Sequence, residues 1–267
     1  MTEGRAPVDG GTLHYEVAGT GPAVVLIHPG LWDSRTWDDQ FGVFCETHRV
    51  LRFDMRGYGR SDRPAGPFSF VEDLRAVMEA AGVERAAIVG CSVGGSVAIE
   101  FVLQHPDMAT ALVAIAPGVD GFISTFGEPA FDWDAAEGPI EAAVEAGDLE
   151  RAHDLEMKLW APLGTTDPVG ARIRQIALEN IQQLKIDWSL AARLDPRPAA
   201  RLGEISVPTL VMLGADDVPG AEEFVDAIVT GISGARKVVI DGADHVVNMR
   251  RPAEFNGIVL EFLDSAV

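Results

Sequence analysis

The run Ala86-Ala87-Ile88-Val89, followed directly by Gly90-Cys91-Ser92-Val93-Gly94-Gly95, decides the fold of this chain. Its first four residues are all apolar, as in a strand that is buried on both faces of a sheet. Residues Val93–Leu103 then repeat apolar side chains at helical spacing, so Ser92 stands at a strand-to-helix turn. The alternative interpretation is a glycine-rich turn that only packs the helix closely on the sheet.

The turn suits a nucleophilic serine. Glycines on both sides of Ser92 remove Cβ atoms that would clash, so the serine can adopt a strained backbone with its hydroxyl exposed. The helix that begins at Val93 points its N-terminus at the reaction centre and favours developing negative charge. Cys91 is a rival nucleophile, because thiolates are intrinsically strong ones. We expect Cys91 to point into the core instead, as a small buried hydrophobe.

Strand and helix patterns alternate along much of the chain, which predicts an α/β fold with a mostly parallel sheet. Strands are predicted at Thr12–Ala18 (the opening strand), Ala23–Ile27, Arg49–Phe53, Ala86–Val89, Leu112–Ala116, Thr209–Leu213 and Lys237–Ile240. Further helices are predicted at Phe70–Ala81, Ala221–Ile232 and Ala253–Leu263. Residues 119–202 contain helical stretches but no clear strand. The sequence therefore predicts a core of residues 1–118 and 203–267 and a helical cap of residues 119–202.

Composition excludes several classes of function. The 267 residues carry 41 acidic and 21 basic side chains, a net charge of −20, so neither nucleic acid nor an anionic membrane is an expected partner. Two cysteines offer no disulfide framework, and the six histidines are scattered singly, so we expect neither a metal nor a cofactor. No stretch has the length and apolarity of a membrane span or a signal peptide. We expect a cytoplasmic protein.

A serine hydroxyl needs a base to accept its proton, and His245 is the best candidate. It follows the predicted strand Lys237–Ile240 on a loop, which is where open α/β sheets place their chemistry. A carboxylate beyond the strand Thr209–Leu213 would orient the imidazole, and Asp217 is our choice there. Asp216 suits a turn or capping role, and Asp244 is too close in sequence to face His245.

An oxyanion hole needs two backbone N–H donors aimed at one point. Val93, the residue after the nucleophile, supplies one of them. The loop His28-Pro29-Gly30-Leu31 supplies the other, and Gly30 is the natural donor because Pro29 has no N–H. We expect His28 to close the preceding strand and brace this loop.

Along essentially its whole length the sequence resembles the α/β-hydrolase fold superfamily. The order Ser92, Asp217, His245 is the order that this fold uses. Four further stretches agree with the family patterns: His28-Pro29-Gly30 with Trp37, the D-x-R-G-x-G-x-S loop of residues 54–61, Gly214-x-x-Asp217 and Gly242-Ala243-Asp244-His245. Pro29 departs from the glycine that the family usually has there, and it leaves the Gly30 donor intact. The resemblance implies that residues 119–202 are the family's cap.

Within the superfamily, Asp38-Asp39-Gln40, residues 64–69 and His245-Val246-Val247-Asn248 resemble the 3-oxoadipate enol-lactonase and small carboxylesterase branch. The resemblance implies a serine hydrolase that cleaves a carboxylic ester or lactone through an acyl-enzyme. Epoxide hydrolases and haloalkane dehalogenases of this fold use Asp as the nucleophile, so Ser92 argues against both. Alternatives are a triad-bearing small-molecule receptor or signalling protein, a carbon–carbon-bond hydrolase and a cofactor-free perhydrolase.

The expected partner is a small-molecule ester or lactone, bound by a monomer or homodimer. Candidate substrate-binding residues are Leu31, Trp133, Trp160 and Val246. Tryptophans that line a pocket would favour a neutral, apolar group, and plain helix packing is the other explanation for them. The enol-lactonase analogy implies instead an anionic substrate and a cationic partner, for which Arg35, Lys158 and Arg151 are candidates.

Overall fold

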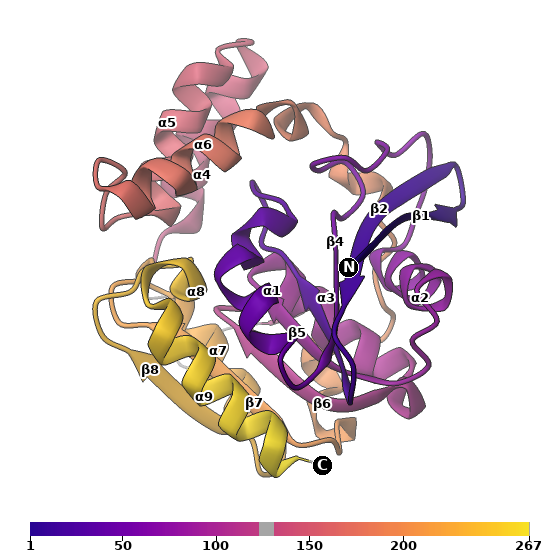
Figure 1. The fold of residues 1–267 in the computed structure, drawn as a ribbon. Coiled ribbons are helices and arrows are strands. Elements are labelled where there is room, and N and C mark those ends of the chain that lie inside the picture. The colour runs from indigo at the N-terminus through magenta and orange to yellow at the C-terminus, as the bar shows by residue number, and fades with distance from the viewer. Residues whose placement is uncertain (123–130, 267) are drawn as a thin grey trace.

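Eight strands form a single sheet in the computed structural model, which describes residues 1–122 and 131–266 (Figure 1). In chain order they are β1 (Thr2–Val8), β2 (Gly11–Ala18), β3 (Ala23–Ile27), β4 (Arg49–Phe53), β5 (Ala86–Cys91), β6 (Ala109–Ile115), β7 (Thr209–Gly214) and β8 (Arg236–Ile240). Across the sheet their order is β1-β2-β4-β3-β5-β6-β7-β8. β2 runs antiparallel to β1 and β4, and the other neighbours are parallel. The predicted α/β fold is confirmed.

Helices cover both faces of the sheet. They are α1 (Asp38–Phe44), α2 (Phe70–Ala80), α3 (Val93–Gln104), α7 (Ala221–Gly231), α8 (Val247–Arg250) and α9 (Pro252–Ser265). Alternate residues of β3 point to opposite faces, as the pleat requires. Val25 and Ile27 share a buried cluster with residues of α2, α3 and α7, whereas Val24 and Leu26 share another with residues of α1 and α9. The central strands are thus covered on both faces, which explains their unbroken apolar runs.

A helical insertion connects β6 to β7. It contains α4 (Trp133–Glu145), α5 (Leu149–Trp160) and α6 (Pro168–Glu179), followed by short 3₁₀ helices. An aspartate caps each of the three α-helices, because the side chains of Asp132, Asp148 and Asp167 accept backbone N–H groups of the first turn. The insertion lies together at one end of the sheet and fits a cap (Figure 1). The exact division at residues 119–202 stays a prediction, and residues 123–130 of it lie outside the described residues.

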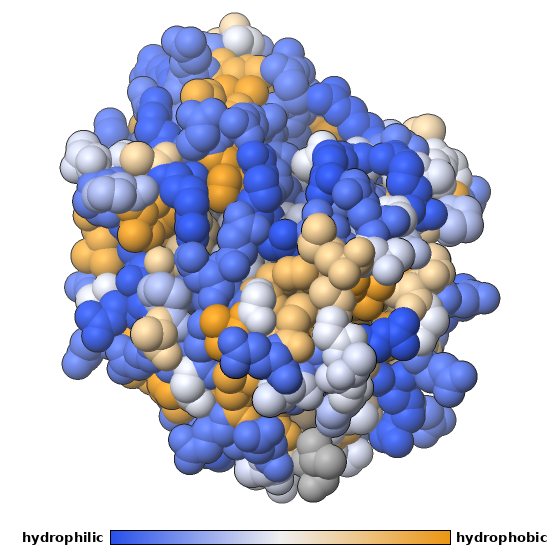
Figure 2. Space-filling model, in the orientation of Figure 1, coloured by the Kyte–Doolittle hydropathy of each residue, from blue (hydrophilic) through white to orange (hydrophobic). Residues whose placement is uncertain are grey.

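Thr12–Ala18 is not the opening strand, because β1 precedes it and pairs with β2. Ala6 is the one buried residue of β1, so this edge strand lacks the apolar pattern that would reveal it. The face drawn in Figure 2 is mainly hydrophilic, with its hydrophobic side chains in small separate groups. Within the described part of the chain, no helix is both long and apolar enough to cross a membrane.

Candidate active site

Ser92 occupies the turn between β5 and α3 with φ 53° and ψ −120°, a backbone conformation that residues other than glycine rarely adopt. The flanking glycines make that turn possible. A Cβ atom on Gly90 would lie 2.0 Å from the carbonyl oxygen of Gly94, and one on Gly94 would lie 2.4 Å from the carbonyl oxygen of Ile27. Neither position tolerates a side chain, so the glycines that flank Ser92 serve the close approach of α3 to the sheet.

Cys91 is fully buried, as expected, and its thiol contacts the carbonyl oxygen of His245 at 3.6 Å. Burial, together with the charge of Asp217, raises the pKa of the Cys91 thiol well above its usual value. A thiol held protonated in the core is a poor nucleophile. Ser92 is therefore the better candidate at this turn.

His245 and Asp217 form a buried pair. The Nδ1 atom of His245 lies 2.9 Å from Oδ1 of Asp217, whose side chain is only 2% exposed. The backbone N–H of Val218 also donates to Oδ1 of Asp217, at 2.7 Å. With Nδ1 donating to the carboxylate, Nε2 is the ring atom that can accept a proton. This Nε2 is buried and has no hydrogen-bond partner among the described residues.

The two other aspartates considered as partners of His245, Asp216 and Asp244, make different contacts. Asp216 is exposed to solvent, and its backbone N–H donates to the carbonyl oxygen of Ala243. Asp244 is fully buried and forms an ion pair with Arg250 at 2.8 Å. Neither contacts the imidazole of His245, so the geometry agrees with the choice of Asp217.

Gly30 and Val93 lie side by side next to Ser92, because a Cβ atom on Gly30 would lie 3.3 Å from Cγ2 of Val93. Val93 opens α3, so its N–H has no acceptor within the helix. Neither N–H group donates to an acceptor in the parts of the chain that the structure describes. Two free donors beside the serine are what an oxyanion hole requires.

His28 holds the loop that carries Gly30. Its Nδ1 atom lies 2.7 Å from the carbonyl oxygen of Pro29, and its Nε2 atom accepts the backbone N–H of Met55 at 2.9 Å. Complete burial lowers the pKa of His28, which favours the neutral ring that these two bonds need. The predicted bracing role of His28 is confirmed.

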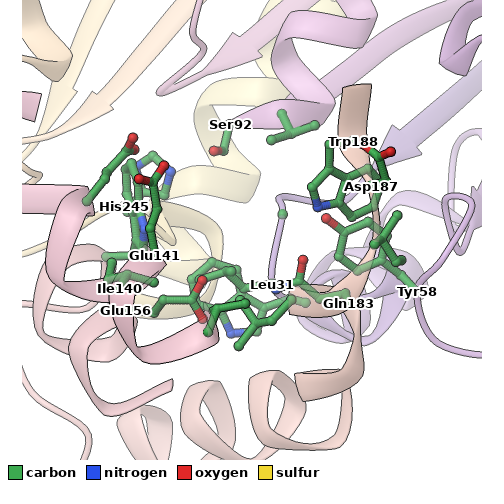
Figure 3. Close-up of a pocket in the computed structure, with 18 of the residues that line it drawn as sticks. Leu31, Tyr58, Ser92, Ile140, Glu141, Glu156, Gln183, Asp187, Trp188 and His245 are labelled. Carbon is green, nitrogen blue, oxygen red and sulfur yellow. The ribbon is translucent and has the colours of Figure 1, made fainter. Parts of the chain in front are cut away.

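Two cavities, of about 890 Å³ and 260 Å³, meet beside Ser92 and His245. Both are lined by Ser92, Val93, Trp160 and His245. The larger one extends beneath α4 and α5 of the insertion, and Figure 3 shows Ser92 and His245 on its wall. An ester bound at Ser92 would thus find separate space for each side of its carbonyl carbon.

The four predicted substrate-binding residues have different locations. Leu31 lines the larger cavity, Trp133 the smaller one and Trp160 both. The Trp160 ring lies 4.6 Å from the His245 ring and stacks on Trp133 at 6.0 Å. Val246 lies elsewhere: it is fully buried in a cluster with residues such as Trp32 and lines neither cavity.

The three cations proposed for an anionic substrate also lie outside these cavities. Arg35 forms ion pairs with Asp33 and Glu179, and Lys158 lines a different cavity of about 340 Å³. Arg151 is exposed on α5. In the described residues, the lining of both cavities contains no lysine or arginine. The described lining contains five acidic residues: Glu137, Glu141, Glu145, Glu156 and Asp187.

Sequence reasoning missed these carboxylates and the aromatic residues on the far wall of the larger cavity. Tyr58 and Trp188 stack there with ring centroids 5.5 Å apart (Figure 3). One signal was present in the sequence. Glu156 precedes Trp160 by four residues, which places both on one face of a helix.

Residues 24–258 match the model of a family described as the alpha/beta hydrolase family, and this chain therefore belongs to that family. The superfamily resemblance found in the sequence is confirmed. Among curated relatives, epoxide hydrolase 3 of Siraitia grosvenorii is 26% identical, and the alignment covers 94% of this chain and 95% of that protein. A putative carbamate hydrolase, RutD of Azorhizobium caulinodans, is 28% identical, with 94% of each chain covered.

A solved structure adds support for the fold. The enol-lactonase from Burkholderia xenovorans LB400 superposes with a TM-score of 0.82 over 98% of this chain and 100% of that one. The two sequences are 24% identical. This match shows the fold, and the family model places the chain among the alpha/beta hydrolases.

Proposed function

We propose that this protein hydrolyses carboxylic esters or lactones through an acyl-enzyme on Ser92. One observation carries the proposal: a strained serine shares a cavity wall with a histidine whose Nδ1 is held by a buried aspartate and whose Nε2 is free. Such an arrangement activates a hydroxyl without a metal or cofactor. The family relatives support hydrolysis as the reaction class.

The proposed reaction has two halves. In the first, Oγ of Ser92 attacks the carbonyl carbon while Nε2 of His245 takes its proton, and Asp217 stabilises the imidazolium. The N–H groups of Gly30 and Val93 hold the oxyanion. His245 then protonates the leaving alkoxide, and the acyl group stays on Ser92. In the second half, His245 deprotonates a water molecule that attacks the acyl-enzyme and releases the acid.

Serine at position 92 favours this reaction over that of the epoxide hydrolase relative. Epoxide hydrolases of this fold use an aspartate nucleophile, and this chain has no carboxylate at the turn. The carbamate named for the RutD relative has the same reacting group as an ester, a carbonyl carbon bearing a leaving group. The cap of residues 119–202 and a monomeric or homodimeric state complete the proposal.

Ser92→Ala tests this function in steady-state assays on a panel of chromogenic esters and lactones. We expect turnover to fall about 10⁴-fold or more, because the remaining residues of a triad supply little without the nucleophile. The control is Ser265→Ala, since that hydroxyl lies at the end of α9 and donates to the carbonyl oxygen of Phe262. Unfolding curves of both variants should match the wild type.

A second readout does not depend on the choice of substrate. A sulfonyl fluoride should label the wild-type protein once, on the peptide that contains Ser92. Ser92→Ala should remain unlabelled. Turnover by Ser92→Ala above a tenth of the wild-type rate would overturn the proposal. A folded wild-type protein that processes no member of the panel and takes no label would favour a receptor.

A further inference from the structure

The inner face of α4 is acidic. Glu137, Glu141 and Glu145 are spaced four residues apart, so they form a stripe along one face of the helix. All three line the larger cavity, and none forms an ion pair or hydrogen bond with a described residue. Like charges at this spacing repel one another. Desolvation, followed by the charges of Glu141 and Asp134, raises the pKa of Glu137.

Glu156 is the stronger observation. It extends from α5 into the same cavity, opposite Ser92 in the view of Figure 3, and is only 7% exposed. No described residue donates a hydrogen bond to it or pairs with it. Burial raises its pKa to about 8. A carboxylate that is removed from water without a partner is costly, so natural proteins rarely contain one that serves no purpose.

Aromatic residues line the same cavity as Glu156. Trp160 lies one turn further along α5, and Tyr58 and Trp188 form their stacked pair across the cavity. Burial, followed by the charge of Glu156, raises the pKa of Tyr58. The faces of aromatic rings attract cations. A buried carboxylate without a partner, in a cavity that aromatic residues also line, suits an ammonium group.

We propose that the larger cavity selects substrates that carry a positively charged ammonium group, held by Glu156 within the cavity that Trp160, Tyr58 and Trp188 also line. This selectivity rests on the proposed function, because it assigns a substrate class to the same site. The acidic stripe of α4 would draw such a substrate toward the cavity. A neutral or anionic substrate would leave Glu156 without a partner or bring it a like charge.

The helix geometry sets the length of that substrate. Trp160 covers the ring of His245 at 4.6 Å, and Glu156 lies four residues before it on α5. Four residues advance a helix by about 6 Å. The charged nitrogen should therefore lie several bonds from the scissile carbonyl. Because each of the two cavities can accept one side of an ester, the charge is tested on both the acyl and the alcohol side.

Two pairs of substrates isolate the charge. The first pair is the 4-nitrophenyl esters of 4-(trimethylammonio)butyrate and of 5,5-dimethylhexanoate, which differ only by nitrogen for carbon at the branched end. The second pair is butyrylcholine and 3,3-dimethylbutyl butyrate. We expect wild-type kcat/KM to favour the charged member of at least one pair by about 10- to 100-fold. Glu156→Gln should reduce this preference at least tenfold and leave the neutral member within about threefold.

Glu150→Gln is the matched control. Glu150 lies on the same helix, is exposed and lines neither cavity, so its variant should keep the wild-type preference. A wild-type enzyme that prefers the neutral member of both pairs would overturn the inference. A preference that survives Glu156→Gln would overturn it equally.

A binding measurement separates this inference from the proposed function. Calorimetry on Ser92→Ala should detect choline, should detect its neutral carbon analogue 3,3-dimethylbutan-1-ol much more weakly, and should lose the difference when Glu156→Gln is added. Binding of this kind without turnover by wild type would support the cation site and contradict the hydrolase. Rapid hydrolysis of the neutral esters without any charge discrimination in either assay would support the hydrolase and contradict the cation site.

Discussion

Two acidic regions of this molecule use their charge differently. At the edge of the sheet, Glu16 of β2 accepts hydrogen bonds from Arg52 and Arg60, both at 2.7 Å. Glu3 of β1 pairs with Arg60 and with the neighbouring histidine, His14. Ligand atoms of Glu3, His14 and Glu16 are close enough to hold a metal ion, but the two arginines already balance these carboxylates. The carboxylates of this region are therefore neutralised by neighbouring side chains within the fold.

The cap shows the opposite arrangement. Glu137, Glu141 and Glu156 face a cavity and lack a cationic partner among the described residues. A carboxylate that is paired within the fold contributes to stability, whereas one left unpaired costs stability until something binds it. Stability measurements can therefore distinguish a structural carboxylate from one reserved for a ligand.

The largest effect is expected at Asp54, which represents the paired region. It is 2% exposed and accepts hydrogen bonds from the backbone N–H and hydroxyl of Ser34 and from the N–H of Arg60. Asp54→Ala leaves these donors unsatisfied, and we expect a loss of about 3–5 kcal/mol in the free energy of unfolding at pH 7. Urea denaturation measures it. Glu46→Ala, at an exposed position, should change the same quantity by less than about 0.5 kcal/mol.

The pH dependence of the free energy of unfolding should differ in direction between the two regions. Burial alone would raise the pKa of Asp54, but His14, the N–H of Arg60 and Ser34 hold it well below its usual range. A carboxyl group with a lowered pKa stabilises the fold above its unfolded pKa, near 4, and loses that contribution as the pH falls further. The difference between wild type and Asp54→Ala should therefore shrink below about pH 4. A difference under about 1 kcal/mol at pH 7 would mean that these hydrogen bonds are not structural.

Glu156→Gln should have the opposite sign and the next largest size. A carboxyl group whose pKa is raised to about 8 is stable in the fold while protonated, and it destabilises the fold as the pH rises from its unfolded value toward 8. Glutamine removes this penalty. We expect the advantage of the variant over the wild type in free energy of unfolding to be about 3–4 kcal/mol larger at pH 8 than at pH 5.

Urea unfolding of Glu156→Gln and of the exposed control Glu150→Gln, each at both pH values, would settle the point. A Glu156→Gln variant that is less stable than wild type at pH 8 would show that Glu156 has a partner within the fold. The contrast between sheet edge and cap would then disappear. A Glu156→Gln variant that is more stable but no longer prefers charged substrates is the result expected if Glu156 serves binding.

The placement of the candidate triad residues was largely predictable from sequence, because they stand at fixed points of a regular pattern. The apolar run before Gly90 and the helical spacing after Ser92 specify a strand-turn-helix unit, and the loops after β7 and β8 place Asp217 and His245 at the same end of the sheet. Strand β1 was not predicted, because Ala6 is its one buried residue and the strand has no apolar pattern. Helix α1 is only seven residues long and was not predicted either.

The cavity could not be predicted in the same way. Val246 follows His245 in sequence, yet the next residue of a loop can point in another direction, and it packs with Trp32 instead. The stripe of Glu137, Glu141 and Glu145 looks in sequence like any solvated helix face. Which face of α4 turns toward Ser92 depends on how the insertion packs on the core, and this tertiary information is absent from local patterns. Apart from the spacing of Glu156 and Trp160, the acidity of the cavity was therefore visible only in the structure.

The smallest effect is expected at Glu141, which is exposed at the margin of the cavity. Glu141→Gln should leave the free energy of unfolding within about 0.5 kcal/mol, because water already solvates this carboxylate. It should lower kcat/KM for the charged ester about two- to threefold through weaker long-range attraction, and 0.5 M salt should erase that difference, since the Debye length is then only about 4 Å. The Glu156→Gln effect should survive the salt, because a buried charge is screened much less. An equal salt response of the two variants would mean that water solvates both carboxylates, and the described lining of the cavity would then differ from the sheet edge only in lacking arginines.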